Sequence, residues 1–226
     1  MTGHIDPQTS RTRRQRPAGK SAPGVPATAK GRTTRAALVR AAREVFERDG
    51  FLNARITDIA ATAKVSHGTF YTYFQSKEEV FADIAQEVLL DMLDLGAPTD
   101  HGHDDPYVMI EQGNRAYLEA YRRNSRMMAV LHQAAAVSDD VGELRRQRRT
   151  PFWNRIERSI LRLQQDGTVS TEINARYAAA ALGSMVSSVA FTCFVDGERL
   201  DFDTAVEQLT FLWANALGIE RPPWLS

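Results

Sequence analysis

The segment from residue 57 to 77, TDIAATAKVSHGTFYTYFQSK, constrains the fold of this chain more than any other part of it. It contains two short stretches with apolar residues at helical spacing, and a tight turn separates them. A helix as short as His67 to Phe74 would not be stable alone in water. We therefore expect Phe70 and Phe74, which lie four residues apart on one face, to anchor it to the rest of the domain.

Capping residues mark where each of these helices begins. Thr57 is the predicted N-cap of the first helix, with Asp58 beside it to complement the helix dipole, and Ser66 is the predicted N-cap of the second. Ser76 and Glu79 form a capping box that starts a third helix directly afterwards. Two short helices joined by a tight turn are the layout of a helix-turn-helix, which places its second helix in the major groove of DNA.

The outward face of the second helix carries hydroxyls, an imidazole and a glycine, and it has no acidic side chain. Such groups can contact phosphates or base edges, and the glycine permits close approach. Lys77 lies at the N-terminal tip of the next helix, a position that suits a phosphate. Tyr71 could also be partly packed. The candidate DNA-contacting residues are Thr57, Ser66, His67, Gly68, Thr69, Tyr71, Thr72, Tyr73 and Lys77.

The wider segment from Ala41 to Ile84 resembles the DNA-binding domain of the tetracycline-repressor (TetR) family. The matching features are Phe46 with Gly50-Phe51, Thr57 before Asp58-Ile59-Ala60, Val65-Ser66, Gly68-Thr69-Phe70-Tyr71, Tyr73-Phe74 and Ser76-Lys77-Glu78. The resemblance implies DNA contacts by Thr57, His67, Gly68, Thr69, Tyr71, Tyr73 and Lys77. His67 lies at a position that varies within the family, so the resemblance does not indicate which base sequence is recognised.

Charge is distributed unevenly along a chain whose net charge is zero. Residues 1–81 hold 14 Lys and Arg against 7 Asp and Glu, whereas residues 82–226 hold 14 against 21. Residues 1–32 are rich in Arg, Pro, Gly, Ser and Thr and lack apolar periodicity, so we expect a disordered basic arm. Such an arm would add salt-dependent affinity for any DNA duplex.

The remaining sequence has helical periodicity and no convincing strand alternation. Helical stretches are predicted from about residue 33 to 50 and from 77 to 95, then near 106–123, 126–137, 141–166, 174–195 and 203–217. We predict an all-α chain with a helix-turn-helix domain over residues 33–80 and a larger effector-binding and dimerisation domain over residues 81–226.

Composition restricts the compartment and the class of protein. The chain of 226 residues is 43% apolar, which is enough for a sizeable core. Its single cysteine, Cys193, excludes an internal disulfide and favours the reducing cytoplasm. The polar, basic N-terminus predicts no secretory signal. The apolar run from Tyr177 to Val195 contains several Gly, Ser and Thr residues, so a buried helix is favoured over a membrane span.

The two last predicted helices, near residues 174–195 and 203–217, carry the signal for self-association. The first is rich in Ala, Gly and Ser, which let another helix approach closely, and the second has apolar side chains on more than one face. We predict a homodimer through both helices, which the resemblance implies as a four-helix bundle. The alternative is an ordinary buried helix pair in a monomer.

The resemblance also implies that the middle helices enclose a small-molecule pocket. Methionines and aromatic residues can line an adaptable apolar cavity, and they favour a lipophilic effector. For each of these side chains, plain core packing is the alternative. The candidate lining residues are Met92, Met109, Tyr117, Tyr121, Met127, Met128, Leu131, His132, Phe152, Trp153 and Phe191.

Several other features are given their simpler interpretation. The segment from His101 to Asp105 holds metal-capable side chains, but without companion ligands at recognisable spacing we predict no metal. The arginines from Arg145 to Arg149 are predicted to be a solvated face rather than a DNA contact. His132 is interpreted as a hydrogen-bonded core histidine, and Cys193 as an inert thiol.

The favoured function is a homodimeric transcriptional repressor that binds a pseudo-palindromic operator in double-stranded DNA and releases it when an effector binds. No phosphate loop, dinucleotide-binding glycine pattern or nucleophile elbow supports the rival interpretation, an enzyme on a helical scaffold, and no cofactor is expected. An architectural DNA-binding protein without an effector would need only the N-terminal half.

Overall fold

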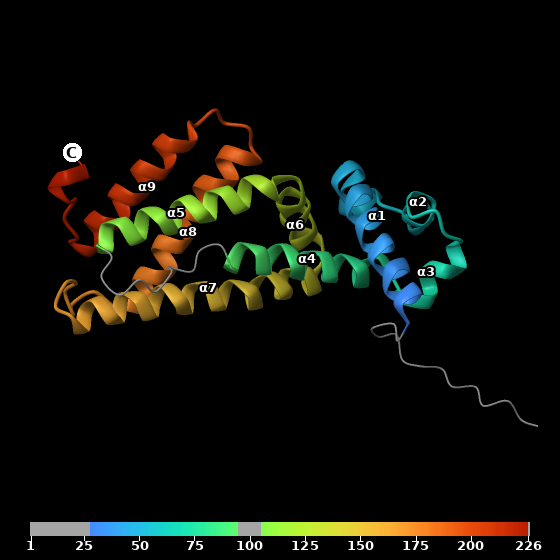
Figure 1. Cartoon of the computed structure of the whole chain (residues 1–226), viewed down its shortest axis with the longest axis horizontal. Helices are drawn as coiled ribbons and strands as arrows, with labels where there is room; N and C mark the ends of the chain where they lie inside the picture. Colours follow the sequence, from blue (N-terminus) through green and yellow to red (C-terminus); the bar gives the residue numbers. More distant parts are fainter. Residues whose placement is uncertain (1–27, 95–104, 226) are drawn as a thin grey trace, which may run out of the picture.

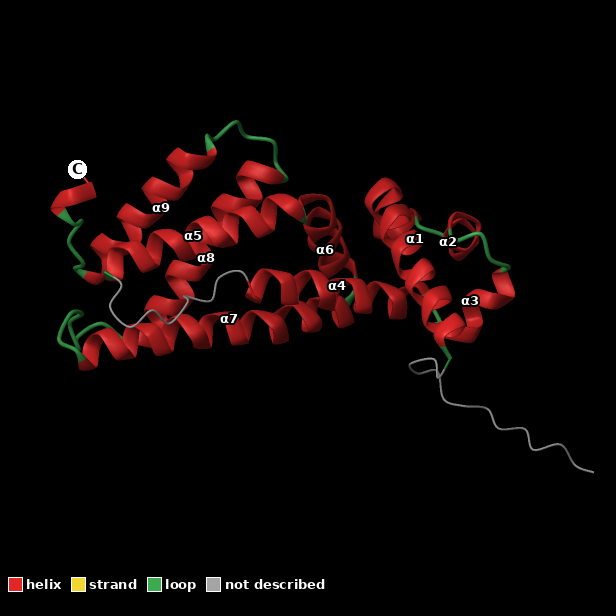
Figure 2. Ribbon diagram, in the orientation of Figure 1, coloured by secondary structure: helices red, strands yellow, loops and turns green. Residues whose placement is uncertain are grey.

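The computed structural model describes residues 28–94 and 105–225, and all regular structure within these residues is helical, as predicted (Figure 2). The elements are α1 (Ala29–Asn53), α2 (Ile56–Thr62), α3 (His67–Tyr73), α4 (Lys77–Asp94), α5 (Pro106–Arg123), α6 (Ser125–Val137), α7 (Asp139–Gln165), α8 (Ala175–Phe194), α9 (Phe202–Leu217) and the 3₁₀ turn η1 (Pro223–Leu225).

The first helix starts earlier than predicted. α1 begins at Ala29 rather than at Thr33, because Thr28 acts as its N-cap and its side chain accepts a hydrogen bond from the Gly31 amide at 3.1 Å. The basic arm therefore ends at least four residues before the predicted boundary. Its predicted disorder concerns residues 1–27, which lie outside the described residues.

The end of α1 is shaped by Gly50. This residue has φ 75°, a conformation that favours glycine, and it breaks the helix where the sequence predicted a stop. Helical geometry resumes for one short turn, whose first amide, that of Phe51, donates to the Gln133 side chain of α6 at 3.3 Å. A Cβ atom on Gly50 would lie 2.7 Å from the same Gln133 oxygen. Gly50 thus allows α1 to dock closely on α6.

The helices form an elongated molecule with α2 and α3 at one end and the C-terminus at the other (Figure 1). α1 packs against α6, and α4 leads from the α1–α3 end towards the C-terminal helices. In the C-terminal half, α7 packs along α8 and α5 packs along α9. The arrangement leaves α3 on the outer surface of the molecule.

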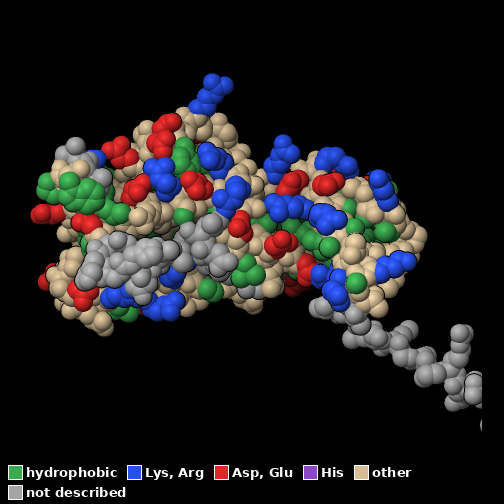
Figure 3. Space-filling model, in the orientation of Figure 1, with side chains coloured by type: hydrophobic (Ala, Val, Ile, Leu, Met, Phe, Trp, Pro, Cys, Tyr) green, Lys and Arg blue, Asp and Glu red, His purple; other side chains and the backbone are tan. Residues whose placement is uncertain are grey.

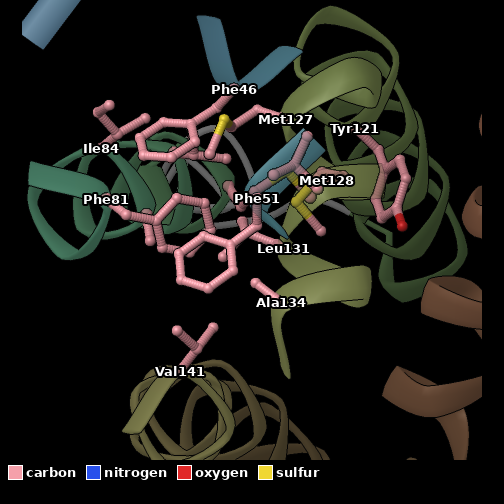
Figure 4. Packing of buried hydrophobic residues seen from close by; sticks show 14 of the residues in the cluster. Phe46, Phe51, Phe81, Ile84, Tyr121, Met127, Met128, Leu131, Ala134 and Val141 are labelled. Atoms are coloured by element: carbon pink, nitrogen blue, oxygen red, sulfur yellow. The ribbon is translucent and has the colours of Figure 1, made fainter. Parts of the chain in front are cut away.

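A continuous apolar core connects the two halves of the chain. Phe46 and Phe51 of α1 meet Phe81 of α4, with ring centroids 5.0 and 4.7 Å from the Phe81 ring, and Met127 and Leu131 of α6 belong to the same cluster (Figure 4). The predicted domain boundary at residue 80 therefore crosses a shared core. A displacement of α6 or α4 would be transmitted directly to α1.

Helix α8 is buried on one face only. Ala179, Val186 and Ala190 are at most 1% exposed, whereas Tyr177 is 77% exposed and Ser184 is exposed too. Within the described residues α8 alone has the length and apolar composition of a membrane-spanning helix, yet it packs against α5, α7 and α9. The predicted burial of this helix holds for one face, because the chain's own helices cover just one side of α8.

Candidate functional site

Helix α3 is the second helix of the predicted helix-turn-helix. It has seven residues and is held at both ends. Ser66 caps it, and its hydroxyl accepts a hydrogen bond from the Thr69 amide at 3.1 Å. Phe70 is fully buried and Phe74 is 1% exposed, so both anchor the helix to the core as predicted. Burial of these two rings supplies the stability that so short a helix lacks alone.

The outward face of α3 displays most of the predicted contact residues. His67, Gly68 and Thr72 are exposed, and Tyr71 is 51% exposed with its ring packed edge-on against the imidazole of His67. Tyr73 is partly buried, as is Thr69. The Thr69 hydroxyl lies 2.8 Å from that of Ser66, so it takes part in the helix cap as well as bordering the surface.

Gly68 serves no purpose in the packing of the chain itself. Its φ is not positive, and a Cβ atom there would meet nothing closer than the Ser66 hydroxyl at 3.9 Å. Glycine in a helix costs about 0.5–1 kcal/mol relative to alanine. The bare backbone of Gly68 is therefore explained better by the approach of a second molecule than by folding.

The start of α2 differs from the prediction. The helix begins at Ile56, and its N-cap is Arg55, whose side chain makes no capping hydrogen bond. Thr57, the predicted N-cap, lies inside the first turn with an exposed side chain. Its hydroxyl is therefore not used to cap α2, and it faces solvent at the same end of the molecule as α3.

Lys77 has a role that the sequence did not reveal. Its ammonium group donates to the carbonyl oxygens of Phe51, Leu52 and Ala54 at 2.9, 3.1 and 3.2 Å. A lysine ammonium has three donors, and all three are used here. Lys77 thus caps the C-terminal end of α1 and has no donor left for a phosphate, contrary to the predicted role. Sequence spacing alone could not place the end of α1 beneath this side chain.

Two exposed cations that the sequence analysis passed over lie beside α2. Arg55 precedes the helix, and Lys64, with φ 56°, lies in the turn that leads to α3. Neither forms an ion pair with a carboxylate of the described residues. Lys and Arg side chains are spread over the surface of this end of the molecule in Figure 3. These two side chains are better placed than Lys77 to contact phosphates.

We expect replacement of Lys77 and of Lys64 by alanine to have opposite signatures. Lys77→Ala should lower the free energy of unfolding by about 1.5–3 kcal/mol, the range for hydrogen bonds to a charged group, and leave the salt dependence of DNA binding unchanged. Lys64→Ala should leave stability within about 0.5 kcal/mol and reduce the salt slope by about 0.9, one phosphate contact. Chemical denaturation and DNA titrations at several salt concentrations measure both quantities. A shallower salt slope for Lys77→Ala would contradict the capping role.

Comparison with known proteins agrees with this geometry. The family described as "Bacterial regulatory proteins, tetR family" matches residues 38–84, which span α2, α3 and the adjoining parts of α1 and α4. Residues 38–84 of this chain are a TetR-family DNA-binding domain.

Relatives that match beyond this TetR-type domain are transcriptional regulators. The chain is 24% identical over 162 residues to the HTH-type transcriptional regulator YvdT of Bacillus subtilis, covering 72% of this chain and 83% of that protein. It is 28% identical over 170 residues to TtgR of Pseudomonas putida, covering 69% and 78%. The fold resembles that of SmeT, the repressor of a Stenotrophomonas maltophilia multidrug efflux pump, with a TM-score of 0.69, 21% identity and coverage of 85% and 96%.

A cavity of about 350 Å³ lies among α4, α5, α6, α7 and α8. Seven of the predicted residues line it: Met92, Tyr117, Met128, His132, Phe152, Trp153 and Phe191. Four predicted residues do not. Tyr121, Met127 and Leu131 are at most 2% exposed and belong to the core cluster, which agrees with the alternative of plain core packing. Met109 lies near the N-terminal end of α5 and does not line the cavity.

The cavity wall also contains residues that sequence analysis assigned elsewhere. Arg145 and Arg149 of α7 line the cavity. Arg149 is exposed, in agreement with the predicted solvated face, whereas Arg145 is partly buried and bonds to His132. Leu89 and four small residues of α8 complete the wall: Gly183, Ser184, Ser187 and Ser188. The small side chains of α8 therefore leave space for the cavity, in addition to the predicted close approach of another helix. The two arginines lie four residues apart, which places both side chains on one face of a helix. This spacing was the sequence signal that could have indicated their shared position at the cavity.

Polar groups of the cavity are held in defined protonation states. Burial and the charge of Arg145 lower the pKa of His132 to about 4, against the weaker opposing effect of Asp196. The neutral imidazole accepts a hydrogen bond from the Arg145 guanidinium, with Nε2 3.1 Å from Nη2. Burial raises the pKa of Tyr117, so its hydroxyl remains a donor at neutral pH. His132 is a hydrogen-bonded histidine, as predicted, but it lines the cavity.

The lowered pKa of His132 predicts a loss of stability in mild acid. Unfolding returns this group to a pKa of 6.5, so the unfolded chain binds more protons between about pH 4 and 6.5. The stabilisation is complete above pH 6.5 and is lost as the pH falls towards 4. Because His132 is only half-buried, solvent screening reduces the loss below the full value of the shift, to about 1–2 kcal/mol. His132→Gln keeps an acceptor for Arg145 and should flatten this part of the stability curve, which denaturant titrations at several pH values measure. An unchanged slope in His132→Gln would refute the assignment.

Within the described residues, no cluster of three metal-capable side chains is present. His101 and His103 lie outside the described residues, and Asp105 caps α5 by accepting a hydrogen bond from the Tyr107 amide at 2.8 Å. Cys193 is half-buried, and burial raises the pKa of its thiol, which keeps it protonated.

Proposed function

We propose that this protein is a homodimeric repressor that binds a pseudo-palindromic operator and releases it when a small molecule fills the cavity. It would act in the cytoplasm and without enzymatic activity. The observation that carries the proposal is that α4 and α6 take part in two sites at once. Each lines the cavity, and each belongs to the core that holds α1.

The coupling can be followed on α6. Met128 and His132 face the cavity, whereas Met127 lies in the core beside Phe46 of α1, and Gln133 bonds to the amide of Phe51. A ligand that pushes α6 outward would therefore move α1 and, through it, α3. The ligand weakens DNA binding only to the extent that it prefers the displaced arrangement.

The proposed dimer rests on two exposed stripes. On α8, Tyr177, Ala181, Ser184 and Ser188 are exposed and recur at spacings of four, three and four residues, which places them on one face. On α9, Phe211 is 46% exposed and Leu212 is 52% exposed. Together they form an apolar and small-residue surface that suits a second copy of the same two helices.

The DNA-contacting residues proposed for each subunit are those that the structure leaves on its outer end. They are Thr57, Ser66, His67, Gly68, Thr69, Tyr71, Thr72 and Tyr73, together with Arg55 and Lys64 beside them. Two copies of α3 related by a twofold axis would read two half-sites, which explains how a helix of seven residues can recognise an operator.

The test is a selection of genomic fragments by the purified protein, followed by footprinting of the bound site. The proposal requires a protected pseudo-palindrome and a molar mass of two chains by light scattering. The rival, an architectural DNA-binding protein, would retain fragments without a shared sequence. That result, or a monomer at micromolar concentration, would overturn the proposed repressor.

A further inference from the structure

The charges around the cavity indicate what kind of molecule it takes. We propose that the cavity binds a compact amphipathic anion, with an aromatic or alicyclic body among the apolar side chains and a carboxylate held by Arg145 and Arg149. This inference rests on the proposed effector role of the cavity and specifies the chemical class of the effector.

The two arginines supply positive charge that the protein itself does not neutralise. Both line the cavity, and none of the residues lining it is acidic. Neither guanidinium lies within ion-pair distance of a carboxylate in the described parts of the chain. Arg146, between them on the outer face of α7, does pair with Glu143, at 2.9 Å. Arg145 and Arg149 thus present positive charge to the cavity, where a bound anion would compensate it.

Both guanidinium groups are held in place without a carboxylate. Arg145 donates to the neutral imidazole of His132, an interaction that uses one of its five N–H donors. Arg149 lies over the ring of Trp153, with its central carbon 4.3 Å from the ring centroid. Donors fixed in this way lose little conformational freedom when a carboxylate binds.

The remainder of the wall suits a flat, apolar body. Phe152, Trp153 and Phe191 contribute aromatic surface, and the hydroxyls of Tyr117 and Ser187 add polar contacts. The volume of about 350 Å³ is at the lower end of the range of about 300–1,000 Å³ for ligand sites. A compact body of one or two rings suits a cavity at this end of the range. Gly183 lets α8 approach this aromatic wall closely, since a Cβ atom there would lie 3.1 Å from Trp153.

The same features disfavour the other classes of effector. A cationic drug would be repelled by two like charges, and its ammonium would find no carboxylate in the described wall. A neutral lipophilic molecule would displace water from the guanidinium groups without replacing those hydrogen bonds. The lipophilic effector predicted from methionines and aromatic residues thus needs an added anionic group.

The experiment is calorimetric titration of the full-length protein with matched pairs of probes. Benzoate, cyclohexanecarboxylate and 2-naphthoate are each compared with the corresponding neutral carboxamide, and 2-naphthylmethylamine serves as the cation. We expect at least one carboxylate to bind tenfold or more tightly than its carboxamide, and the amine not to bind. Arg145→Gln combined with Arg149→Gln should reduce that preference to less than twofold. Arg146→Gln, on the same helix but facing outward, should retain it.

Two further controls keep the result decisive. Circular dichroism and thermal melting establish that each variant is folded, and Arg149→Gln alone serves if the double variant unfolds, because Arg149 is exposed. Equal binding of acid and amide, preference for the amine, or no carboxylate binding up to millimolar concentration would each overturn the anion site. DNA binding is measured separately without ligand, so its absence would count against the repressor while leaving the anion site standing.

Discussion

Replacing Phe211 by glutamate is expected to convert the dimer into a monomer at micromolar concentration and to weaken operator binding about 10²–10⁴-fold. Phe211 is 46% exposed on α9, in the surface that we assign to the second copy. Twofold symmetry places the substitution on both sides of the interface, so two carboxylates would be buried without partners. A monomer also loses the gain in affinity that comes from linking two half-site contacts, and this gain sets the expected range.

Light scattering and operator titrations measure the two effects, and a matched control separates them from a general effect of surface charge. Leu90→Glu introduces the same side chain at a leucine of α4 that is 43% exposed and lies outside the two stripes. It should leave the molar mass and the DNA affinity unchanged. A Phe211→Glu protein that is still a dimer would place the interface elsewhere on the molecule.

The proposed interface and the cavity share part of one surface. Ser184 and Ser188 line the cavity and also belong to the exposed stripe of α8. A second subunit seated on that stripe would therefore lie against one wall of the cavity. Effector affinity should then depend on dimerisation. The small residues of α8 would contribute both to the subunit interface and to the cavity wall.

Helix positions could be predicted well from the sequence, because local signals determine them. The predicted helix over residues 106–123 coincides with α5, which Asp105 caps and Pro106 begins. The early start of α1 was missed because Thr28 and Thr33 are comparable capping residues in sequence. The exposed face of α8 agrees with the small-residue face predicted to meet another helix, although composition alone did not indicate which neighbours cover the opposite face.

The same distinction between local sequence signals and contacts with distant segments applies to the functional residues. The face of α3 follows from helical spacing and the anchoring of Phe70, so the exposure of His67, Gly68, Tyr71 and Thr72 could be predicted, while their contact with DNA stays a prediction. The role of Lys77 depends on carbonyls about 25 residues away, and that of Arg145 on a histidine of the preceding helix. Contacts between distant segments of this kind leave no periodic signal in a single sequence.

Replacing Gly68 by glutamate is expected to abolish recognition of the operator, with a loss of affinity of about a hundredfold or more, while the protein stays folded. Gly68 lies in the first turn of α3, where an acidic side chain is favoured by the helix dipole, and a Cβ atom meets only the Ser66 hydroxyl at 3.9 Å. Stability should therefore be unchanged or slightly higher. On the surface assigned to DNA, the same side chain adds bulk and negative charge against a polyanion.

The matched control is Gly113→Glu, the same substitution at a helical glycine of α5 where a Cβ atom would meet nothing within 4 Å. Both variants change the net charge equally, so a loss confined to Gly68→Glu has to come from the contact surface rather than from long-range repulsion. Gly68→Ala gives the steric part alone, because alanine adds a methyl group without charge. If Gly68→Ala and Gly68→Glu both bind the operator like the parent protein, α3 does not enter the groove, since no arrangement that buries its first turn against DNA could accept both side chains.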